Sequence, residues 1–297
     1  MDIKSYLSHK RQLIDEALAS LLPRPENELD WHFASLNYSL QAGGKRVRPI
    51  LCLATAEALG WQTDARLLPL ICSLECIHTY SLIHDDLPAM DDDELRRGKP
   101  TNHMIYGEAG AILAGDGLLT FAFELLSQPE ISDLLSNGEQ LKIIHLIAQA
   151  IGSRGMVGGQ ALDMTAEDQA ISLEALQMIH RCKTGALITA SVQTGAIIGQ
   201  ASNAQFHALT AYGNRIGLAF QIIDDLLNVL GTPEQLGKAA GSDAKHNKAT
   251  YPAFFGVEKT RDKAQDTIQA AIDALAGFDQ TAEPLRELAR YIYNRTN

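Results

Sequence analysis

Apolar residues recur at three- and four-residue intervals along almost the entire chain of 297 residues. This spacing is typical of helices that bury one face, whereas half-buried strands require alternating apolar and polar residues. Such alternating runs, bounded by turn residues, are absent, and the strong helix formers alanine and leucine dominate the sequence. The sequence therefore predicts an all-α fold.

Turn residues divide this pattern into a series of expected helices. Neither a linker nor a change in composition interrupts the chain, and an apolar content of 46% is enough for a large core. We therefore predict one domain covering residues 1–297. The helices are expected at residues 2–22, 29–41, 50–60, 64–87, 107–127, 138–154, 172–182 with a continuation to about 199, 203–230, 253–276 and 281–294.

The net charge of −11 argues against a nucleic-acid-binding surface. The four cysteines do not form the spacing pattern of a disulfide framework. The first residues are not followed by the apolar core of a signal peptide, and no run reaches 18 apolar residues. We therefore expect a cytoplasmic protein without a membrane span.

A dense acidic segment follows one of the apolar stretches. Six carboxylates occupy residues 85–94, and such a cluster favours bound cations because unpaired carboxylates repel one another. Asp85, Asp86 and Asp91 could supply the hard oxygen ligands that suit Mg²⁺. A solvated helix end is the ordinary alternative for a single acidic run. Pro88 should kink the helix, so Asp91 need not follow helical angles relative to Asp85.

A second acidic motif ends another apolar stretch, which makes metal binding the favoured interpretation of both motifs. Asp224 and Asn228 lie four residues apart and therefore share one helix face. Asp225 is turned by about 100° and is assigned a supporting role. We expect the two acidic motifs to hold Mg²⁺ between them.

Two basic turns accompany the acidic motifs. Lys45, Arg46 and Arg48 lie in a glycine-flanked turn before a helix, and two arginines occupy residues 96–97. Backbone donors and cations in such turns favour a phosphate-type anion, although either turn alone fits an ordinary basic surface equally well. His78 lies two helical turns before the first acidic motif, but a lone histidine in an apolar helix is usually a hydrogen-bonded core residue.

Together these features indicate a chemistry. A magnesium-bound diphosphate is a good leaving group because the metal takes up the negative charge that develops on it. Separate basic turns imply a second anionic substrate. No Ser-His-Asp or Cys-His arrangement is evident in the sequence, so nothing supports covalent catalysis.

Six segments resemble, in order and spacing, the motifs of the trans-polyprenyl diphosphate synthases, and most closely those of the bacterial farnesyl diphosphate synthases. The resemblance extends over nearly the whole chain, and six agreeing motifs are far more specific than any one. The segments are residues 43–49 (GGKRVRP), 85–91 (DDLPAMD), 96–98 (RRG), 183–185 (KTG), 220–225 (FQIIDD) and 248–252 (KATYP).

The resemblance implies the isoprenoid-synthase helical bundle around a central cavity, usually as a homodimer. It implies that three Mg²⁺ ions are held by Asp85, Asp91 and Asp224. Isopentenyl diphosphate would be bound by Lys45, Arg48, His78 and Arg97. The allylic substrate, its diphosphate or its cation would be contacted by Arg96, Lys183, Thr184, Gln221 and Lys238, and Lys248 would lie in a loop that closes over the site.

The implied reaction is ionisation, condensation and elimination. Dimethylallyl diphosphate loses its diphosphate, the double bond of isopentenyl diphosphate attacks the resulting cation, and a proton leaves. A second round on the C10 product gives farnesyl diphosphate. Tyr80 and Ser81 occupy the positions that limit product length in the family, and an aromatic residue at position 80 resembles the farnesyl-making enzymes.

Several alternatives stay open. The family usually has a third aspartate where this chain has Asn228, so we expect weaker binding of metal or isopentenyl diphosphate there. The chain could instead be a geranylgeranyl diphosphate synthase, or a non-catalytic regulatory subunit of a heteromeric synthase. A terpene cyclase would share the acidic motifs but needs no second diphosphate site at residues 45–48. A plain acidic cation-binding scaffold leaves the ordered basic turns without a purpose.

Overall fold

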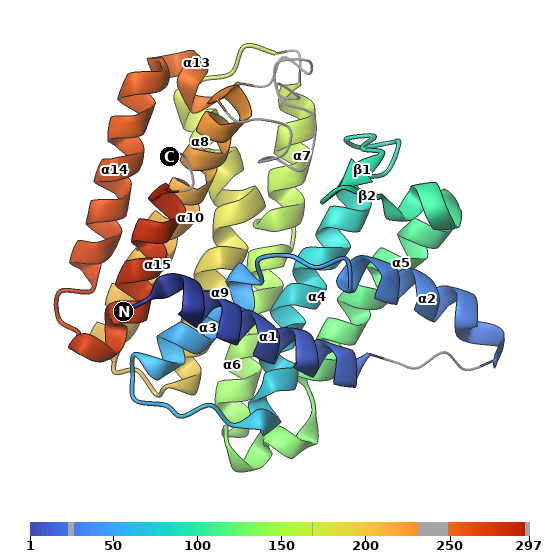
Figure 1. Ribbon diagram of the computed structural model, residues 1–297, viewed down its shortest axis with the longest axis horizontal. Helices are drawn as coiled ribbons and strands as arrows, with labels where there is room; N and C mark the ends of the chain where they lie inside the picture. Colours follow the sequence, from blue (N-terminus) through green and yellow to red (C-terminus); the bar gives the residue numbers. More distant parts are fainter. Residues whose placement is uncertain (23–26, 168, 231–248, 295–297) are drawn as a thin grey trace. The chain divides into compact units, whose positions relative to one another are not determined.

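The computed structural model describes residues 1–22, 27–167, 169–230 and 249–294, and nearly all regular structure in these residues is helical (Figure 1). This confirms the predicted all-α class. Packing contacts divide the chain into two compact units, each formed by separate segments. Residues 7–50 and 64–144 form what we call the N-terminal unit, and the described parts of 1–6, 51–63 and 145–297 form the C-terminal unit. The single domain stays a prediction.

The N-terminal unit is built around a buried helix. Its α-helices are α1 (Ile3–Leu21) from residue 7 onward, α2 (Asp30–Leu40), α3 (Val47–Glu57) up to residue 50, α4 (Leu68–Asp85), α5 (Asn102–Leu126) and α6 (Asn137–Ile151) up to residue 144. Short 3₁₀ helices cover Asn27–Leu29, Ala65–Leu67 and Pro129–Asp133, and a hairpin joins β1 (Leu95–Arg96) to β2 (Lys99–Pro100). Apolar residues are distributed around the whole circumference of α4, and most of its side chains are buried.

Helix α5 packs along α4, and α2 packs on α5. Gly115 of α5 permits the closest approach, since a Cβ there would overlap the ring of His84 on α4. By length and composition alone, Ala65–Asp85 and Asn102–Asp133 could each cross a membrane, but 72% of the first segment's apolar window is buried. The core helices of soluble proteins can have the same length and composition, so the expected lack of a membrane span stays a prediction.

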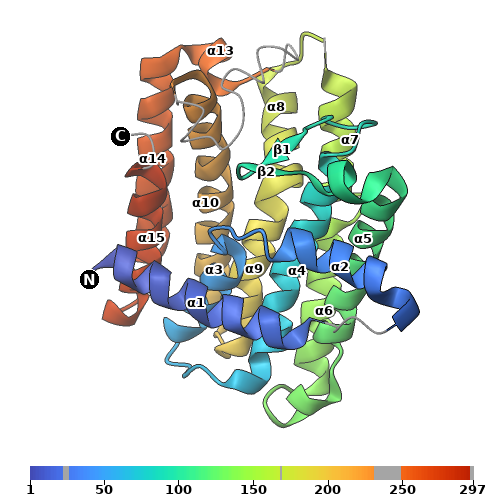
Figure 2. The same cartoon turned by 45° about the vertical axis from the view of Figure 1, so that its right-hand side comes forward.

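The C-terminal unit is organised around α10 (Asn203–Leu230). Helices α9 (Ala186–Ile198) and α14 (Val257–Ala274) pack along α10, as both ribbon views show (Figures 1 and 2). The unit also contains α7 (Met156–Ala166), α8 (Leu173–His180), α13 (Tyr251–Phe255) and α15 (Glu283–Tyr293), with a π-helix at Arg181–Gly185 and a 3₁₀ turn at Gln280–Ala282.

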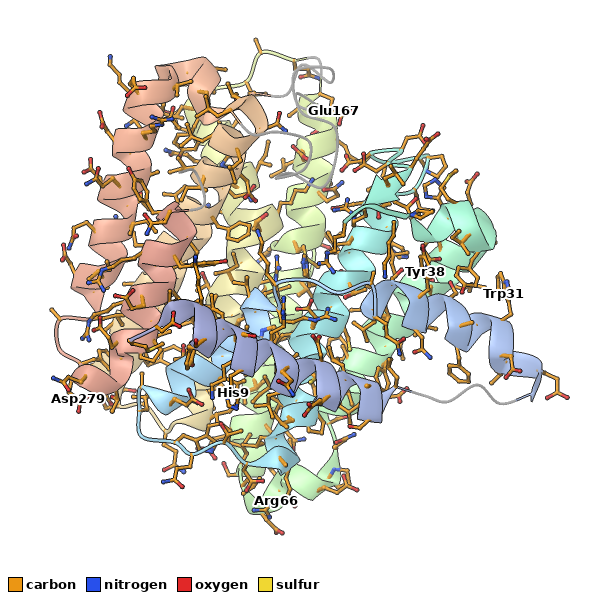
Figure 3. The ribbon with its side chains drawn as sticks, in the orientation of Figure 1. His9, Trp31, Tyr38, Arg66, Glu167 and Asp279 are labelled. Atoms are coloured by element: carbon orange, nitrogen blue, oxygen red, sulfur yellow. The ribbon has the colours of Figure 1, made fainter. Side chains whose placement is uncertain are left out.

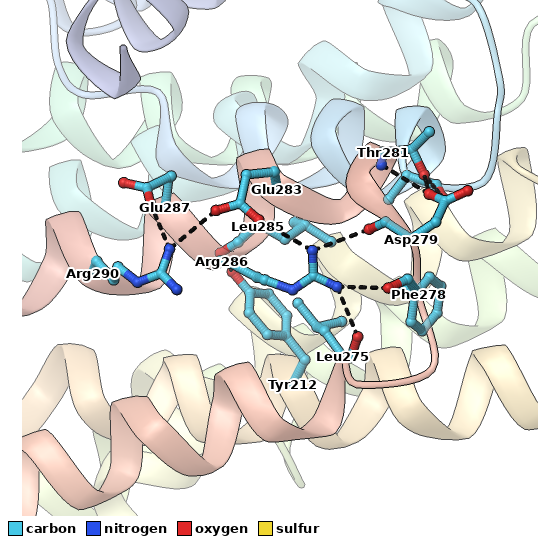
Figure 4. Close-up of polar contacts among 11 residues, drawn as sticks. Tyr212, Leu275, Phe278, Asp279, Thr281, Glu283, Leu285, Arg286, Glu287 and Arg290 are labelled. Atoms are coloured by element: carbon cyan, nitrogen blue, oxygen red, sulfur yellow. Dashed lines mark hydrogen bonds and ion pairs between the residues drawn. The ribbon is translucent and has the colours of Figure 1, made fainter. Parts of the chain in front are cut away.

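One arginine fixes the corner between α14 and α15 (Figure 4). The guanidinium of Arg286 donates hydrogen bonds of 2.7–3.0 Å to the backbone carbonyls of Leu275, Phe278 and Asp279. These carbonyls follow the end of α14, and Arg286 gives each of them a side-chain donor; those of Leu275 and Asp279 also accept the backbone N–H groups of Phe278 and Ala282. The hydroxyl of Tyr212 on α10 donates to the carbonyl of Leu285 at 2.7 Å, which attaches the same corner to the core.

Several helices differ from their expected bounds, among them α3, which is displaced by three residues from the expected 50–60, and three further differences are local. The helix expected at 253–276 is divided at Gly256, whose φ of 74° breaks the helical path. Helix α5 begins at Asn102, five residues before the expected residue 107, and Gly107, with a φ of 74°, kinks it at the point where the expected helix starts. The helix expected at 64–87 ends at Asp85, two residues early.

Candidate active site

The first acidic motif forms a closed loop at the end of α4. The expected kink at Pro88 is wrong, because α4 ends before the proline instead of bending through it. The chain then returns, and the backbone N–H of Asp91 donates to the carbonyl of Asp85 at 2.8 Å. Two of the three residues predicted to bind Mg²⁺, Asp85 and Asp91, therefore share one loop at the end of α4, although they are six positions apart.

Asp86 connects the same helix end to the hairpin. It is buried, and Arg96 Nε donates to its two carboxylate oxygens at 2.7 and 2.9 Å. Burial raises the pKa of Asp86 and Arg96 opposes this shift. Arg96 also lies 3.5 Å from Asp93. In this structure the guanidinium predicted to meet the allylic diphosphate is thus engaged by carboxylates of the acidic motif.

Basic residues of the turn 43–49 and of the hairpin lie close to His78 on α4. A Cβ on Gly44, in the turn 43–49, would lie only 2.7 Å from Nη1 of Arg97, so the turn and the hairpin touch. Burial, followed by the charges of Arg48 and Arg97, lowers the pKa of His78 well below its usual value. Its Nδ1 is buried and has no hydrogen-bond partner among the described residues. A bound anion would relieve this crowding of positive charge.

These basic groups suit a diphosphate. Burial lowers the pKa of Arg97, so its charged form gains most from an anionic ligand. Lys45 is exposed and Arg48 is half-buried on the same turn and helix start. A cavity of about 30 Å³ between α2, α4 and the hairpin is lined in part by Asp86, Arg96 and Arg97. The arrangement brings together in one unit all four residues predicted to bind isopentenyl diphosphate.

The two residues predicted to limit product length lie on α4. Tyr80 is only 6% exposed, and its ring meets the ring of His84 edge-on with 5.8 Å between centroids. Burial raises the pKa of Tyr80 to about 12, so its hydroxyl stays neutral. Ser81 is half-buried and donates to the carbonyl of His78 at 2.8 Å. Of the two, Tyr80 is therefore the bulkier and the more deeply buried side chain.

The second acidic motif lies on α10 in the C-terminal unit. Asp224 is half-buried, and Asn228 follows one turn later on the same face. Asp225 points elsewhere: it is buried, and its Oδ2 accepts the backbone N–H of Tyr251 at 2.8 Å. Asp225 thereby attaches the first residue of α13 to α10.

An aromatic stack covers this contact. The ring of His180 is parallel to that of Tyr251 with 5.7 Å between centroids, and its Nε2 lies 3.8 Å from Oδ1 of Asp225. Gln177 donates to the hydroxyl of Tyr251 at 3.2 Å. Burial lowers the pKa of His180 to about 4, so the imidazole is neutral at pH 7.

Lys183 and Thr184 lie in the π-helix between α8 and α9, where the helix expected at 172–182 passes into its continuation. Such π-turns are frequent at functional sites. Lys183 Nζ donates to Oδ2 of Asp163 on α7 at 2.7 Å, and both side chains are largely shielded from solvent. Gln221 is half-buried on α10, three residues before Asp224 and near its face.

Two predicted site residues, Lys238 and Lys248, lie outside the described residues. Within the described ranges, no group of three or more His, Cys, Asp or Glu side chains is preformed for a metal ion. Mg²⁺ usually takes one or two carboxylates together with waters and substrate phosphates, so it does not require such a cage. The carboxylates of Asp85 and Asp91 are hard oxygen ligands carried by one closed loop, and such a pair fits this mode of binding.

Some partners of the site residues were not predicted from the sequence. Asp163 pairs with Lys183, twenty positions away, and Glu75 pairs with Arg46, 29 positions away. His180 and Tyr251 stack although 71 residues separate them along the chain. No local pattern identifies such pairs. Of these partners, Tyr251 belongs to one of the six motif segments, residues 248–252, and the sequence could have identified it in that way.

Comparisons with known proteins agree over the full chain. The model of the polyprenyl synthetase family matches residues 30–288. The geranylgeranyl diphosphate synthase of Cyanophora paradoxa is 45% identical over all of this chain and 97% of its own length, and the farnesyl diphosphate synthase of Geobacillus stearothermophilus is 44% identical over 99% and 98%. A crystal structure of an FPP/GFPP synthase from Zymomonas mobilis superposes with a TM-score of 0.87 at 39% identity, covering 98% of this chain and 99% of that one. The chain therefore belongs to the polyprenyl synthetase family of prenyltransferases and has its all-α isoprenoid-synthase fold.

Proposed function

We propose that this chain is a farnesyl diphosphate synthase. Prenyl transfer and the use of Mg²⁺ are properties of the family. Relatives of equal similarity make either the C15 or the C20 product by name, so product length needs its own support. That support is Tyr80, a bulky and buried side chain five residues before Asp85 on α4.

Each substrate is assigned its own residues. Lys45, Arg48, His78 and Arg97 bind the diphosphate of isopentenyl diphosphate, which suits their shared position beside α4. The allylic diphosphate is bound by Arg96, Lys183 and the two residues outside the described ranges, Lys238 and Lys248, while Thr184 and Gln221 face the allylic carbons. Three Mg²⁺ ions, held by Asp85, Asp91 and Asp224, would neutralise the charge that develops on the departing diphosphate.

The reaction then proceeds by substitution at carbon. The bond between C1 of the allylic substrate and its diphosphate oxygen breaks with both electrons leaving on oxygen. The double bond of isopentenyl diphosphate supplies the electron pair for the new carbon–carbon bond. One proton leaves the condensed product to the released diphosphate, and the double bond re-forms. Apolar side chains around the site would keep water away from the cation.

The neutral His78 contributes a specific property to the isopentenyl diphosphate site. Because its pKa lies well below neutrality, it adds no positive charge and acts as a hydrogen-bond donor from one ring nitrogen. The cations that surround it supply the charge.

The activity assay is direct. The purified chain alone, incubated with isopentenyl and dimethylallyl diphosphates and Mg²⁺, should form farnesyl diphosphate as its main product, and chelation of Mg²⁺ should abolish the reaction. Geranylgeranyl diphosphate as the main product would favour the C20 synthase. No turnover without a second protein would favour the non-catalytic subunit.

Product length is predicted to depend on Tyr80. Tyr80→Ala removes the bulky ring and should shift the main product from C15 to C20 or longer, because the growing chain can then extend along α4. Chromatographic sizing of the products measures the shift. Tyr80→Phe keeps the ring and should keep the C15 product. An unchanged product from Tyr80→Ala would remove the support for this assignment.

A further inference from the structure

Arg46 is the central cation of the turn 43–49, but its side chain faces inward. It is only 4% exposed, whereas Lys45 before it is exposed. Its backbone has a φ of 50°, in the left-handed region that residues with a side chain seldom adopt. A strained conformation of this kind persists only where surrounding contacts enforce it. The contacts of Arg46 therefore decide the shape of the turn.

The guanidinium of Arg46 joins three helices of the N-terminal unit. Its Nε donates to Oδ1 of Asp15 on α1, its Nη1 to Oε1 of Glu75 on α4, and its Nη2 to the carbonyl of Leu40 at the end of α2. All three distances are 2.8 Å. Only a planar guanidinium presents donors in three fixed directions at once, and a lysine ammonium at this place cannot span them.

Glu75 makes this contact difficult to replace. Its side chain is 1% exposed, and its second oxygen has no hydrogen-bond partner among the described residues. Without Arg46, α4 would carry a buried and uncompensated carboxylate. The charge of Glu75 also favours the protonated form of Arg97, which links the pair to the hairpin.

The turn 43–49 also determines where the cations next to Arg46 lie. Lys45 and Arg48 flank Arg46, and Gly44 lies directly against the guanidinium of Arg97, where a Cβ would stand only 2.7 Å from Nη1. A displacement of the turn would therefore move three of the cations assigned to isopentenyl diphosphate.

We propose that Arg46 is a positioning residue: it holds the turn 43–49 against α1, α2 and α4 so that Lys45, Arg48 and Arg97 meet the diphosphate of isopentenyl diphosphate, and it does not touch the substrate. This inference rests on the proposed function for the identity of the ligand. The two arginines of the turn then have different roles: Arg46 positions the turn, and Arg48 binds the diphosphate.

The test separates positioning from stability. Arg46→Met alone leaves Glu75 unpaired and can fail to fold, so the informative protein is Arg46→Met combined with Glu75→Met. Replacing both members of a buried ion pair by apolar residues often leaves stability unchanged. We expect this double variant to fold, to raise the KM for isopentenyl diphosphate by about tenfold or more, and to change the KM for the allylic substrate less than about threefold. A wild-type KM for isopentenyl diphosphate in the folded double variant would overturn the proposal.

A second variant distinguishes positioning from direct contact. Arg46→Lys keeps the charge and keeps Glu75 paired, but it loses the three-way contact. We expect its KM for isopentenyl diphosphate to rise as well. If the lysine variant binds isopentenyl diphosphate as tightly as the wild type, a charge contact to substrate is the better explanation and the proposal is wrong.

Hydrogen exchange supplies a readout that needs no substrate. Amide exchange in the peptide covering residues 43–49 should accelerate in the double variant, while exchange in α5 stays unchanged. Equal exchange in both proteins would overturn the positioning role even if the enzyme is active. If instead the wild type neither binds nor condenses isopentenyl diphosphate, the proposed function fails, and the exchange result still decides the role of Arg46.

Arg66 is the matched control. It is an arginine of the same unit that projects outward (Figure 3) and forms an ion pair with Asp64, two residues away. Arg66→Met should leave the KM for isopentenyl diphosphate and the exchange of residues 43–49 unchanged. A comparable change in Arg66→Met would show that any loss of positive charge has this effect, and would overturn the specific assignment.

Discussion

Adjacent aspartates of the second acidic motif have different surroundings, and we predict different roles. Asp225→Leu removes the acceptor for the N–H of Tyr251 and should lower the free energy of unfolding by about 2 kcal/mol, the usual worth of a hydrogen bond to a charged group. Asp224→Asn should instead raise the Mg²⁺ concentration needed for activity and leave stability nearly unchanged. Denaturant unfolding and magnesium titration measure the two effects.

Asp225→Asn is the control for this pair, because its amide oxygen can still accept the Tyr251 N–H. It should restore most of the stability lost in Asp225→Leu. If Asp225→Asn and Asp224→Asn raise the magnesium requirement equally, the two aspartates share one role and the division is wrong.

The neutral His180 predicts a loss of stability in acid. Burial is the main cause of its low pKa; Asp163 raises and Lys183 lowers it, and Asp225 lies 3.8 Å away. Above pH 6.5 both states carry a neutral imidazole. Between pH 6.5 and about 4 the unfolded chain binds a proton that folded His180 does not, so folding stability falls by up to about 3 kcal/mol over this window.

The measurement is the free energy of unfolding at pH 7 and pH 4.5, compared between the wild type and His180→Gln. The variant should lose less stability than the wild type on acidification, while His78 and the carboxylates contribute equally to both proteins. Parallel curves for the two proteins would contradict a depressed pKa at His180.

At the scale of helices, glycine determines how closely α7 approaches the π-helix. A Cβ on Gly159 would lie 2.6 Å from the Cα of Lys183, so Gly159→Ala must push the two elements apart. We expect a loss of stability of about 1–3 kcal/mol from overpacking and a reduced kcat, because the displacement weakens the ion pair between Lys183 and Asp163. Gly138→Ala on α6, whose nearest neighbour is 4.0 Å away, should change neither quantity.

Periodicity predicted the helices well because it reports which face is buried, and α10 has the expected bounds of 203–230. It failed where one residue changes the backbone path, as at Gly256, or where proline ends a helix, as before Pro88. The local chemistry of the acidic and basic segments was readable from residue types. The partners of Arg46 and Lys183 were not, since three-dimensional packing alone brings those residues together.

For the whole molecule we propose a homodimer. The expectation comes from the family resemblance, and light scattering coupled to size-exclusion chromatography tests it. The measured mass should be twice the 32.3 kDa of one chain over a tenfold range of protein concentration. A mass of one chain throughout that range would contradict the proposal.

The loop closed by the N–H of Asp91 and the carbonyl of Asp85 has a practical consequence for protein engineering. A main-chain hydrogen bond, and not the pitch of a helix, holds the backbones of these two residues together. Leu87 is buried and must be kept, but Pro88 and Ala89 point into solvent. Position 89 is therefore a place within this loop where a spectroscopic label or a randomised library can be introduced without replacing a buried side chain.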